Sequence, residues 1–445
     1  MRLDRVSRSL LLAIAVLAAA SPLPAAEADL SASIQGFGFD LHRRLASERK
    51  SVVFSPYSLW LAFVTVRAGA RGETAKELDA ALHLPAGGLV DAHRALSESL
   101  RASMEKGVRA YERERRRFQD EEEDRFVERD QPLLPPVYQV LNRLFVQTGL
   151  PLQERFLRRL TVHYDTPVLR LDFSDPSSAS ARINAWLERE TRGQLRGAVS
   201  PSSFAAETRL ALITAVTFRG SWHTLFDEDV RELPFHGVDG ETYEVPTMML
   251  EEELPYAEDA RLQVLELPYK GKEFSMLLLL PRRWDGLPEL ERRLSPELLS
   301  SYVSRLQRRQ VVVRMPEFQV RNDLDARRAL QSLGVRRLFV RGKAQLGDLS
   351  PVPELCVNGV AHSARIAVDR RGTVAEAVTA VGLEFGVEPP PPVYFIADHP
   401  FVFVLRHPKT GCVLFLGRFG APERAPVGRR ATPAAKSDDA GGEGE

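Results

Sequence analysis

The chain is 445 residues long; 44% of its residues are apolar and 27% are charged, a balance typical of a globular protein with a sizeable core. This length allows one large mixed domain or two to three average ones. The 60 basic residues cancel the 60 acidic ones, so bulk charge gives no support for binding nucleic acid or an anionic membrane.

The N-terminus has the pattern of an export signal. Three arginines precede the apolar run 10–20, which is too short to span a bilayer. The small-x-small sequence Ala26-Glu27-Ala28 fits a cleavage site. We therefore expect a signal peptide over residues 1–28, a mature chain that begins near Asp29, and a secreted or periplasmic destination.

Apolar residues at helical spacing over 34–45 predict a first amphipathic helix. Ser55-Pro56 supplies a cap and a first-turn proline for a second, buried helix. A capping box at Thr74 and Glu77 predicts a third.

Residues 105–130 crowd charges of both signs together, with four consecutive acidic residues at 121–124. One interpretation is a docking arm for a charged partner. The mixed signs favour a solvated helical or disordered insertion.

Strands dominate the second half of the chain, with helices interleaved at 287–306 and 323–333. The β-prone runs are 137–146, 210–218, 262–267, 275–280, 311–318, 393–396, 401–405 and 413–416. Helices come first and strands follow, with a further helix at 181–192. This order predicts an α+β protein built on large, mostly antiparallel sheets.

The sequence lacks the short motifs of common enzymes: a nucleophile elbow, a zinc helix, a phosphate loop and a paired-cysteine metal site. Its 9 histidines are scattered. We therefore predict that the chain is not an enzyme and needs no metal or cofactor. The two cysteines, Cys356 and Cys412, either form one bridge or are two small buried residues, and the usual burial of cysteine favours the second.

The segment from Gly372 to Glu388 alternates like a strand but is punctuated like a loop. One face carries Thr, Ala, Ala, Thr, Val, Leu and Phe at the odd positions 373–385, and both glutamates up to residue 384 lie on the other face. Glycines loosen the segment, and the prolines 389–392 bar regular pairing beyond it. Such a segment is suited to two structural states.

The chain resembles the serpins from about Leu30 to Pro422. The resemblance depends on ordered motifs: Phe54-Ser55-Pro56-Tyr57-Ser58-Leu59, Gly69-Ala70-Arg71-Gly72-Glu73-Thr74, Ile183-Asn184-Ala185-Trp186-Leu187, Leu265-Glu266-Leu267-Pro268-Tyr269-Lys270-Gly271 and Ala397-Asp398-His399-Pro400-Phe401. With the export signal, the chain is identified as an exported, prokaryotic-type member of the serpin superfamily.

The resemblance implies a serpin fold of three β-sheets and eight or nine helices, with an exposed reactive loop. It implies a serpin domain over 29–422 that includes the 105–130 insertion, and we expect a disordered tail over 423–445. The implied activity is suicide-substrate inhibition of a serine or cysteine protease. The protease cleaves the loop, stays covalently attached, and is carried along as the loop enters the main sheet. We expect a monomer with no nucleic-acid or membrane partner.

The resemblance assigns roles to particular loop residues. The hinge, where small residues let the loop enter the sheet, is Gly372, Thr373, Ala375, Ala377 and Thr379. Counting from the hinge places the reactive bond at Gly386-Val387, with Phe385 as the alternative specificity residue.

These small or aromatic residues indicate an elastase-like, chymotrypsin-like or subtilisin-like target. Arg370 stands where the family usually has glutamate, a departure that weakens the expected anchoring of the closed loop.

A polar cluster beneath the main sheet is implied by Ser55, Ser58 and His362, with Thr214 where asparagine is usual. Trp222 matches the family tryptophan at the top of the sheet. We interpret His362 as structural and gating, not catalytic.

The residues leave other functions open. The first is a non-inhibitory serpin that acts as a carrier, chaperone or structural binding protein, which Arg370 and Thr214 favour. The second is a binding module recruited through the 105–130 arm. A hydrolase is the weakest of the three.

Overall fold

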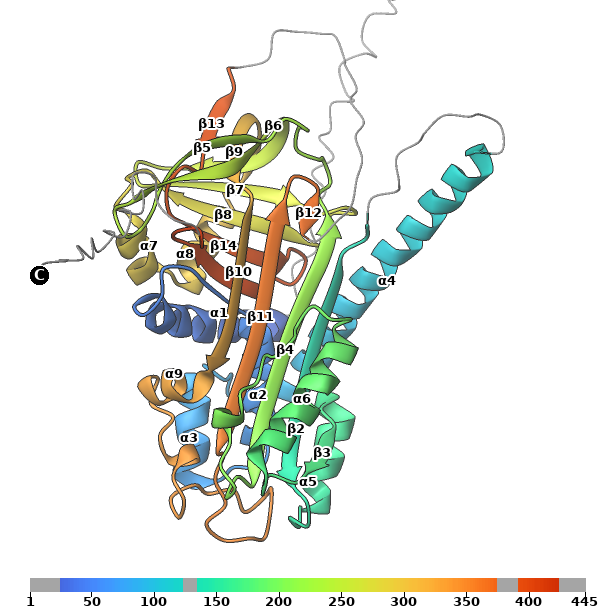
Figure 1. Ribbon diagram of the computed structural model, residues 1–445, viewed down its shortest axis with the longest axis vertical. Coiled ribbons are helices and arrows are strands. Elements are labelled where there is room, and N and C mark those ends of the chain that lie inside the picture. The colour runs from blue at the N-terminus through green and yellow to red at the C-terminus, as the bar shows by residue number, and fades with distance from the viewer. Residues whose placement is uncertain (1–24, 123–133, 374–390, 424–445) are drawn as a thin grey trace, which may run out of the picture.

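Figure 1 shows a computed structural model of the protein, which describes residues 25–122, 134–373 and 391–423. Within these residues the chain forms nine α-helices and two hydrogen-bonded sheets. The helices are α1 (Ala25–Ala46), α2 (Pro56–Arg67), α3 (Gly72–Ala81), α4 (Leu89–Glu122), α5 (Glu154–Arg159), α6 (Pro176–Glu190), α7 (Leu287–Arg293), α8 (Pro296–Val303) and α9 (Ala326–Ser332).

The smaller sheet contains Gly372 and Thr373, the start of the predicted hinge. Its strands, in spatial order, are β10 (Phe318–Asp325), β11 (Gly359–Asp369), β12 (Gly372–Thr373), β4 (Leu210–Ser221), β2 (Val137–Gln147) and β3 (Val168–Leu171). The very short β12 lies at one end of the sheet, and beyond it β11 pairs directly with β4.

The larger sheet has two parts. The first contains β1 (Val52–Phe54), β15 (Cys412–Phe419), β14 (Phe401–His407), β8 (Ser275–Pro281) and β7 (Leu262–Pro268); the second contains β6 (Thr242–Glu258), β9 (Gln307–Pro316), β13 (Val393–Ile396) and β5 (Arg231–His236). Only the last three residues of β6 pair with β7 and join the two parts. If these two parts are counted as separate sheets, they and the smaller sheet make up the three sheets that the resemblance implies.

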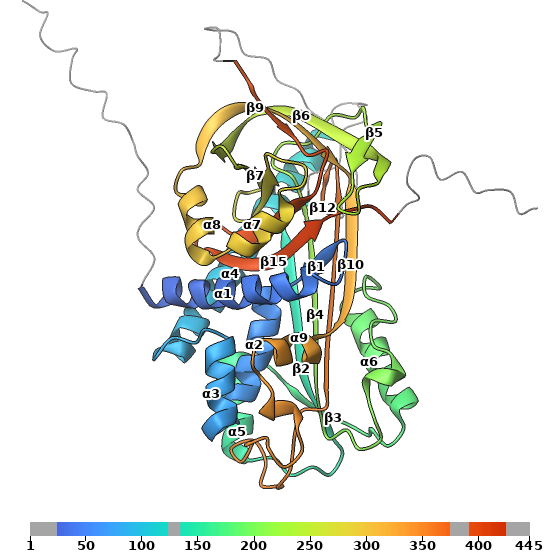
Figure 2. The same cartoon turned by 90° about the vertical axis from the view of Figure 1, so that its left-hand side faces the viewer.

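One face of the smaller sheet packs on the main core, and α6 covers part of the other face, as Figure 2 shows. Helix α2 packs against β2, β4 and β15 in the main core, whereas α6 lies on the opposite face over a smaller apolar cluster around Ile183 and Trp186. Where both faces are covered, opening the sheet exposes apolar surface.

Helix α2 begins as the sequence predicts. The Ser55 hydroxyl accepts a hydrogen bond from the Ser58 N–H at 3.1 Å, and Pro56 occupies the first turn. The prediction of a capping box at Thr74 and Glu77 was wrong, because α3 already begins at Gly72. The Thr74 hydroxyl instead accepts a hydrogen bond from the Gln345 N–H, and the Glu77 carboxylate accepts one from a backbone N–H of another segment.

Three other element predictions needed correction. The predicted strand 311–318 is split between β9 and β10, because the chain passes from one sheet to the other at Glu317. The predicted helix 287–306 is broken before Pro296, which starts α8. The predicted helix 323–333 begins only at Ala326, since β10 continues to its N-cap residue, Asp325.

Helix α4 contains much of the charged insertion and extends it away from the body of the protein (Figure 1). Its contacts with the body include Ser103 with His407 at 2.9 Å and Glu114 with Lys270 at 3.1 Å. The predicted insertion is helical up to Glu122, and most of its side chains up to Arg116 are exposed or half-buried. Residues 123–130 lie outside the described part.

The two cysteines are free and buried, so the prediction of two unpaired buried thiols is confirmed. In the described ranges, no helix combines the length and apolar character needed to cross a membrane. The predicted signal peptide lies mostly before Ala25, and its predicted cleavage point after Ala28 falls in the first turn of α1.

Candidate functional site

The start of the predicted hinge lies inside the smaller sheet. Gly372 and Thr373 form β12, which pairs antiparallel with Asp369 and Val368 of β11 and with Ser221 and Gly220 of β4. These two residues therefore have a neighbouring strand on each side to pair with their backbone groups.

Glycine is required at position 372. Its φ is 153°, and a Cβ there would lie 2.2 Å from the carbonyl oxygen of Gly220. An L side chain therefore fits neither the backbone conformation nor the space between the strands. The neighbouring Thr373 is fully buried, and its hydroxyl bonds the Tyr269 hydroxyl at 2.7 Å.

Trp222 anchors the turn that leads into the hinge. Its indole N–H donates to the Asp369 carbonyl at 3.0 Å, and its backbone N–H donates to the Arg371 carbonyl at 2.9 Å. The ring stacks on Tyr269 with the centroids 4.5 Å apart. One aromatic pair thus holds both the turn and Thr373, and sequence reasoning missed Tyr269 although it lies in a quoted motif.

Arg370 is held mainly by its backbone. Its carbonyl accepts from the Phe226 N–H at 3.0 Å, and its N–H donates to Glu317 Oε1 at 3.4 Å. The guanidinium lies 3.9 Å from a carboxylate oxygen of Glu228. Burial raises the pKa of Glu317. An arginine at this position therefore sits beside two carboxylates, and the turn keeps its backbone anchors.

Beyond β12 the sheet is closed. Strands β4 and β11 pair in parallel from Ala211 with Gly359 to Val216 with Ala364. A side-chain hydrogen bond reinforces this ladder, since Thr214 and His362 face each other in it and are joined at 2.6 Å.

The hydrogen bonds of His362 define its tautomer. The Ser55 N–H donates to Nε2 at 3.1 Å, so Nε2 carries the lone pair and Nδ1 carries the proton. Nδ1–H therefore donates to Thr214 Oγ1. Complete burial lowers the pKa of His362 to about 3, which keeps the ring neutral. This is a structural histidine that joins β11 to both α2 and β4.

The predicted cluster has two members that sequence reasoning missed. Ser58 donates to Asn142 Oδ1 at 3.0 Å, and the Asn142 amide donates back to the Ser58 carbonyl at 3.1 Å. Tyr138 lies 3.2 Å from the Ser55 hydroxyl. A buried asparagine inside the apolar β2 run was a signal, because such a residue needs partners.

The structure thus brings Ser55, Ser58, Thr214 and His362 together around α2, while Trp222 lies apart, at the hinge. Of the predicted hinge, Gly372 and Thr373 are described. The other loop residues lie outside the described part: Ala375, Ala377, Thr379, Phe385, Gly386 and Val387.

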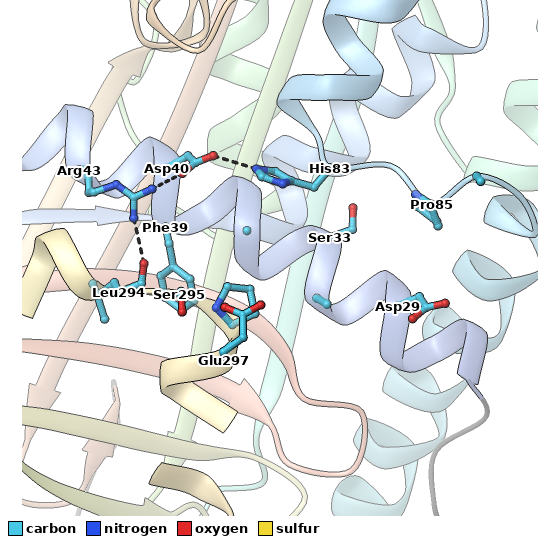
Figure 3. A pocket seen from close by; sticks show the side chains of 14 residues that line it. Asp29, Ser33, Phe39, Asp40, Arg43, His83, Pro85, Leu294, Ser295 and Glu297 are labelled. Atoms are coloured by element: carbon cyan, nitrogen blue, oxygen red, sulfur yellow. Dashed lines mark hydrogen bonds and ion pairs between the residues drawn. The ribbon is translucent and has the colours of Figure 1, made fainter. Parts of the chain in front are cut away.

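Two other features of the described residues were compared with this site: a surface pocket and possible metal ligands. A pocket of about 620 Å³ lies between α1, the segment after α3 and the start of α8, where Asp40 bonds His83 at 2.8 Å (Figure 3). It contains none of the predicted site residues. Within the described residues, no group of three or more histidine, cysteine or acidic side chains is placed to hold a metal.

Comparison with known proteins gives the family. The profile for the family Serpin (serine protease inhibitor) matches residues 32–422. Neuroserpin of Rattus norvegicus is 32% identical over 394 residues, which cover 86% of this chain and 88% of that protein. An uncharacterised serpin-like protein of Thermococcus kodakarensis is also 32% identical, with 88% and 85% covered. Leukocyte elastase inhibitor of Bos taurus is 31% identical, with 88% and 99% covered.

Solved structures of serpins also match this chain in fold. The crystal structure of native protease nexin-1 with heparin matches with a TM-score of 0.74 at 25% identity, covering 89% of this chain and 100% of that one. Uncleaved ovalbumin matches in fold with a TM-score of 0.72 at 24% identity, covering 88% and 100%. The chain belongs to the serpin family, whose members include protease inhibitors such as leukocyte elastase inhibitor.

Proposed function

We propose that this protein is a suicide-substrate inhibitor of a serine or cysteine protease. The protease nucleophile attacks the carbonyl of Gly386, an acyl-enzyme forms, and the amine of Val387 leaves. The freed segment then enters the smaller sheet as a strand between β4 and β11 and carries the attached protease with it. Phe385 is the alternative specificity residue.

The single observation that carries this proposal is the position of β12. Gly372 and Thr373 already pair with both strands that a longer insertion would separate. Continuing the same register would bring Ala377 between Val216 and Ala364, where the closed ladder begins. Two residues further, Thr379 would reach Thr214 and His362. Insertion must therefore replace the ladder from Val216 and Ala364 onward, and the side-chain bond between Thr214 and His362 two residues further along.

The energetics favour insertion once the loop is cut. Thr373 faces the core, so the residues of the same parity face it too as the strand grows. Burying Val381, Leu383 and Phe385 contributes about 5 kcal/mol or more before new ladder hydrogen bonds are counted. About fifteen inserted residues at roughly 3.3 Å each span about 50 Å, the length of a small protease. The intact form is therefore held kinetically.

The experiment uses the mature protein and a panel of elastase-, chymotrypsin-, subtilisin- and papain-like proteases. We expect an SDS-stable complex with at least one of them and, by mass spectrometry, a cut at or within a few residues of Gly386. The cut protein should melt at a clearly higher temperature than the intact one. Cleavage with neither complex nor stabilisation would sink this mechanism and favour the carrier, chaperone or structural alternative.

We further propose that the protein is exported after cleavage at Ala28 and acts as a monomer, without a membrane or nucleic-acid partner. The export signal and the neutral total charge support this. N-terminal sequencing of the exported protein and size-exclusion chromatography with light scattering test both points. A retained Met1 or a stable dimer would contradict them.

A further inference from the structure

A second site lies against the back of the hinge anchor. A cavity of about 270 Å³ has Trp222 in its wall, together with residues from β6, β7, the turn after β7 and β9. Its apolar lining includes Leu250, Leu254 and Leu267, which are at most 5% exposed. An aromatic and aliphatic lining of this kind suits the flat apolar body of a small molecule.

The mouth of this cavity carries the polar groups. Exposed Lys272 and His223 lie there, and among the described residues neither side chain has a hydrogen-bonding or ion-pair partner. Arg308 is bonded to Glu253 at 2.8 Å, and Glu252 accepts from the Glu253 N–H at 3.0 Å.

Two carboxylates, Glu252 and Glu253, and two cations, Lys272 and Arg308, line the cavity around His223. Arg308 pairs with Glu253, and Glu252 bonds a backbone N–H, so Lys272 is the cation without a partner among the described residues. The pKa of His223 is lowered by partial burial and then by Lys272 and Lys270, with a smaller lowering from Arg308 and only Glu252 acting in the opposite sense. The unpaired ammonium and the imidazole can therefore receive one anionic group.

The cavity is connected to the hinge through Trp222. The residue that forms its wall also holds the carbonyls of Asp369 and Arg371 and stacks on Tyr269, which bonds Thr373. Trp222 is only 1% exposed, so a molecule that fills the cavity would act by restricting movement of the indole away from the position that these bonds require. Because coupling between two sites is reciprocal, a hinge that leaves the sheet weakens binding in the cavity.

We propose that this cavity binds a small organic anion with a flat apolar body, and that it binds more tightly when Gly372 and Thr373 lie in the sheet. The inference goes beyond protease inhibition and does not require it, since it depends only on contacts present in the uncut protein.

The first test measures binding of 1-naphthoate to the mature protein by isothermal titration calorimetry, with neutral 1-naphthamide as the matched probe. We expect naphthoate to bind about tenfold more tightly, as hydrogen bonds to a charged group imply. Lys272→Glu should remove this preference. Lys343→Glu makes the same charge change at an exposed lysine outside the cavity and should not. Equal binding of the two probes, or no binding of either, would overturn the proposed site.

The second test concerns the hinge. Gly372→Val places a side chain against the Gly220 carbonyl and so drives the hinge out of the sheet. The control is Gly88→Val, another glycine with positive φ (71°), where a Cβ has nothing within 4 Å. We expect severalfold weaker naphthoate binding for Gly372→Val alone, with both variants checked for cooperative melting. Unchanged affinity in a folded Gly372→Val protein would overturn the link to the hinge.

Discussion

His362 is neutral in the folded protein because burial removes water from the ring and two hydrogen bonds fit only one tautomer. Thr214 provides one of these two hydrogen bonds. It stands where the family usually has asparagine, and its hydroxyl accepts a hydrogen bond from His362 Nδ1–H at 2.6 Å. The amide function is present one strand away, where Asn142 of β2 lies opposite Thr214. The cluster is therefore complete without an asparagine on β4.

Acid should destabilise the protein through its buried histidines. Burial lowers the pKa of His362 to about 3 and the pKa values of His93 and His407 to about 4, whereas a histidine in the unfolded chain titrates near 6.5. Below pH 6.5 the unfolded chain therefore binds more protons, and the free energy of unfolding falls down to about pH 4. Each histidine contributes up to about 1.4 kcal/mol per pH unit.

Denaturant unfolding of the intact protein between pH 8 and pH 4.5 measures this effect. We expect stability to be flat above pH 7 and to fall below it. His362→Gln should lower the free energy of unfolding at pH 8. It should also reduce the slope of this free energy against pH by the contribution of one histidine. A variant with the wild-type slope would show that His362 is not the group that titrates.

At the scale of elements, β12 is the described start of the predicted reactive loop. Its pairing partners lie on strands that are far apart in sequence and adjacent in space. The same two strands close into a parallel ladder below it. The hinge is therefore the first part of a strand whose continuation is blocked by β4–β11 pairing and by the Thr214–His362 bond.

Thr373→Glu tests this interpretation. A carboxylate at a fully buried position costs several kcal/mol unless it is paired, so the cut loop should fail to insert. We expect the target protease to cleave the variant while the yield of SDS-stable complex falls about tenfold or more. Glu376→Gln, which changes a residue on the predicted exposed face, is the control and should form complex normally. Undiminished trapping by Thr373→Glu would contradict insertion from β12.

Helix α4 offers a test of the docking-arm alternative. Its contacts with the body among the described residues extend to Glu114, which bonds Lys270, so the shortening should begin after it. Replacing residues 115–132 by a Gly/Ser linker should leave both the melting temperature and the rate of protease inhibition unchanged, the latter within about twofold. A loss of inhibition with unchanged melting would assign the arm a role in partner binding.

At the scale of the whole molecule, the proposed mechanism requires a more stable state that the intact protein does not reach while the loop is uncut. A synthetic peptide with the sequence of residues 374–385 should occupy the site of the missing strand, beyond the chain's own Gly372 and Thr373 in β12. We expect it to raise the melting temperature by about 10 °C, given about 5 kcal/mol of new apolar burial, and to abolish protease trapping. The same peptide with glutamate in place of its threonine should do neither. If both peptides act alike, the stabilisation does not come from strand insertion.

Local patterns determined much of this protein from the sequence alone. Ser55-Pro56 caps a buried helix, the β-prone runs became strands, and the motif order gave the family, because capping, alternation and apolar periodicity act between residues close in the chain. The central strand β11 was missed, since its residues become a strand through pairing with β10 and β4. The tertiary structure alone brought His362 to Thr214, Tyr269 to Thr373 and Trp222 to the hinge turn. Those contacts join residues about 100 to 150 positions apart, and no local propensity specifies them.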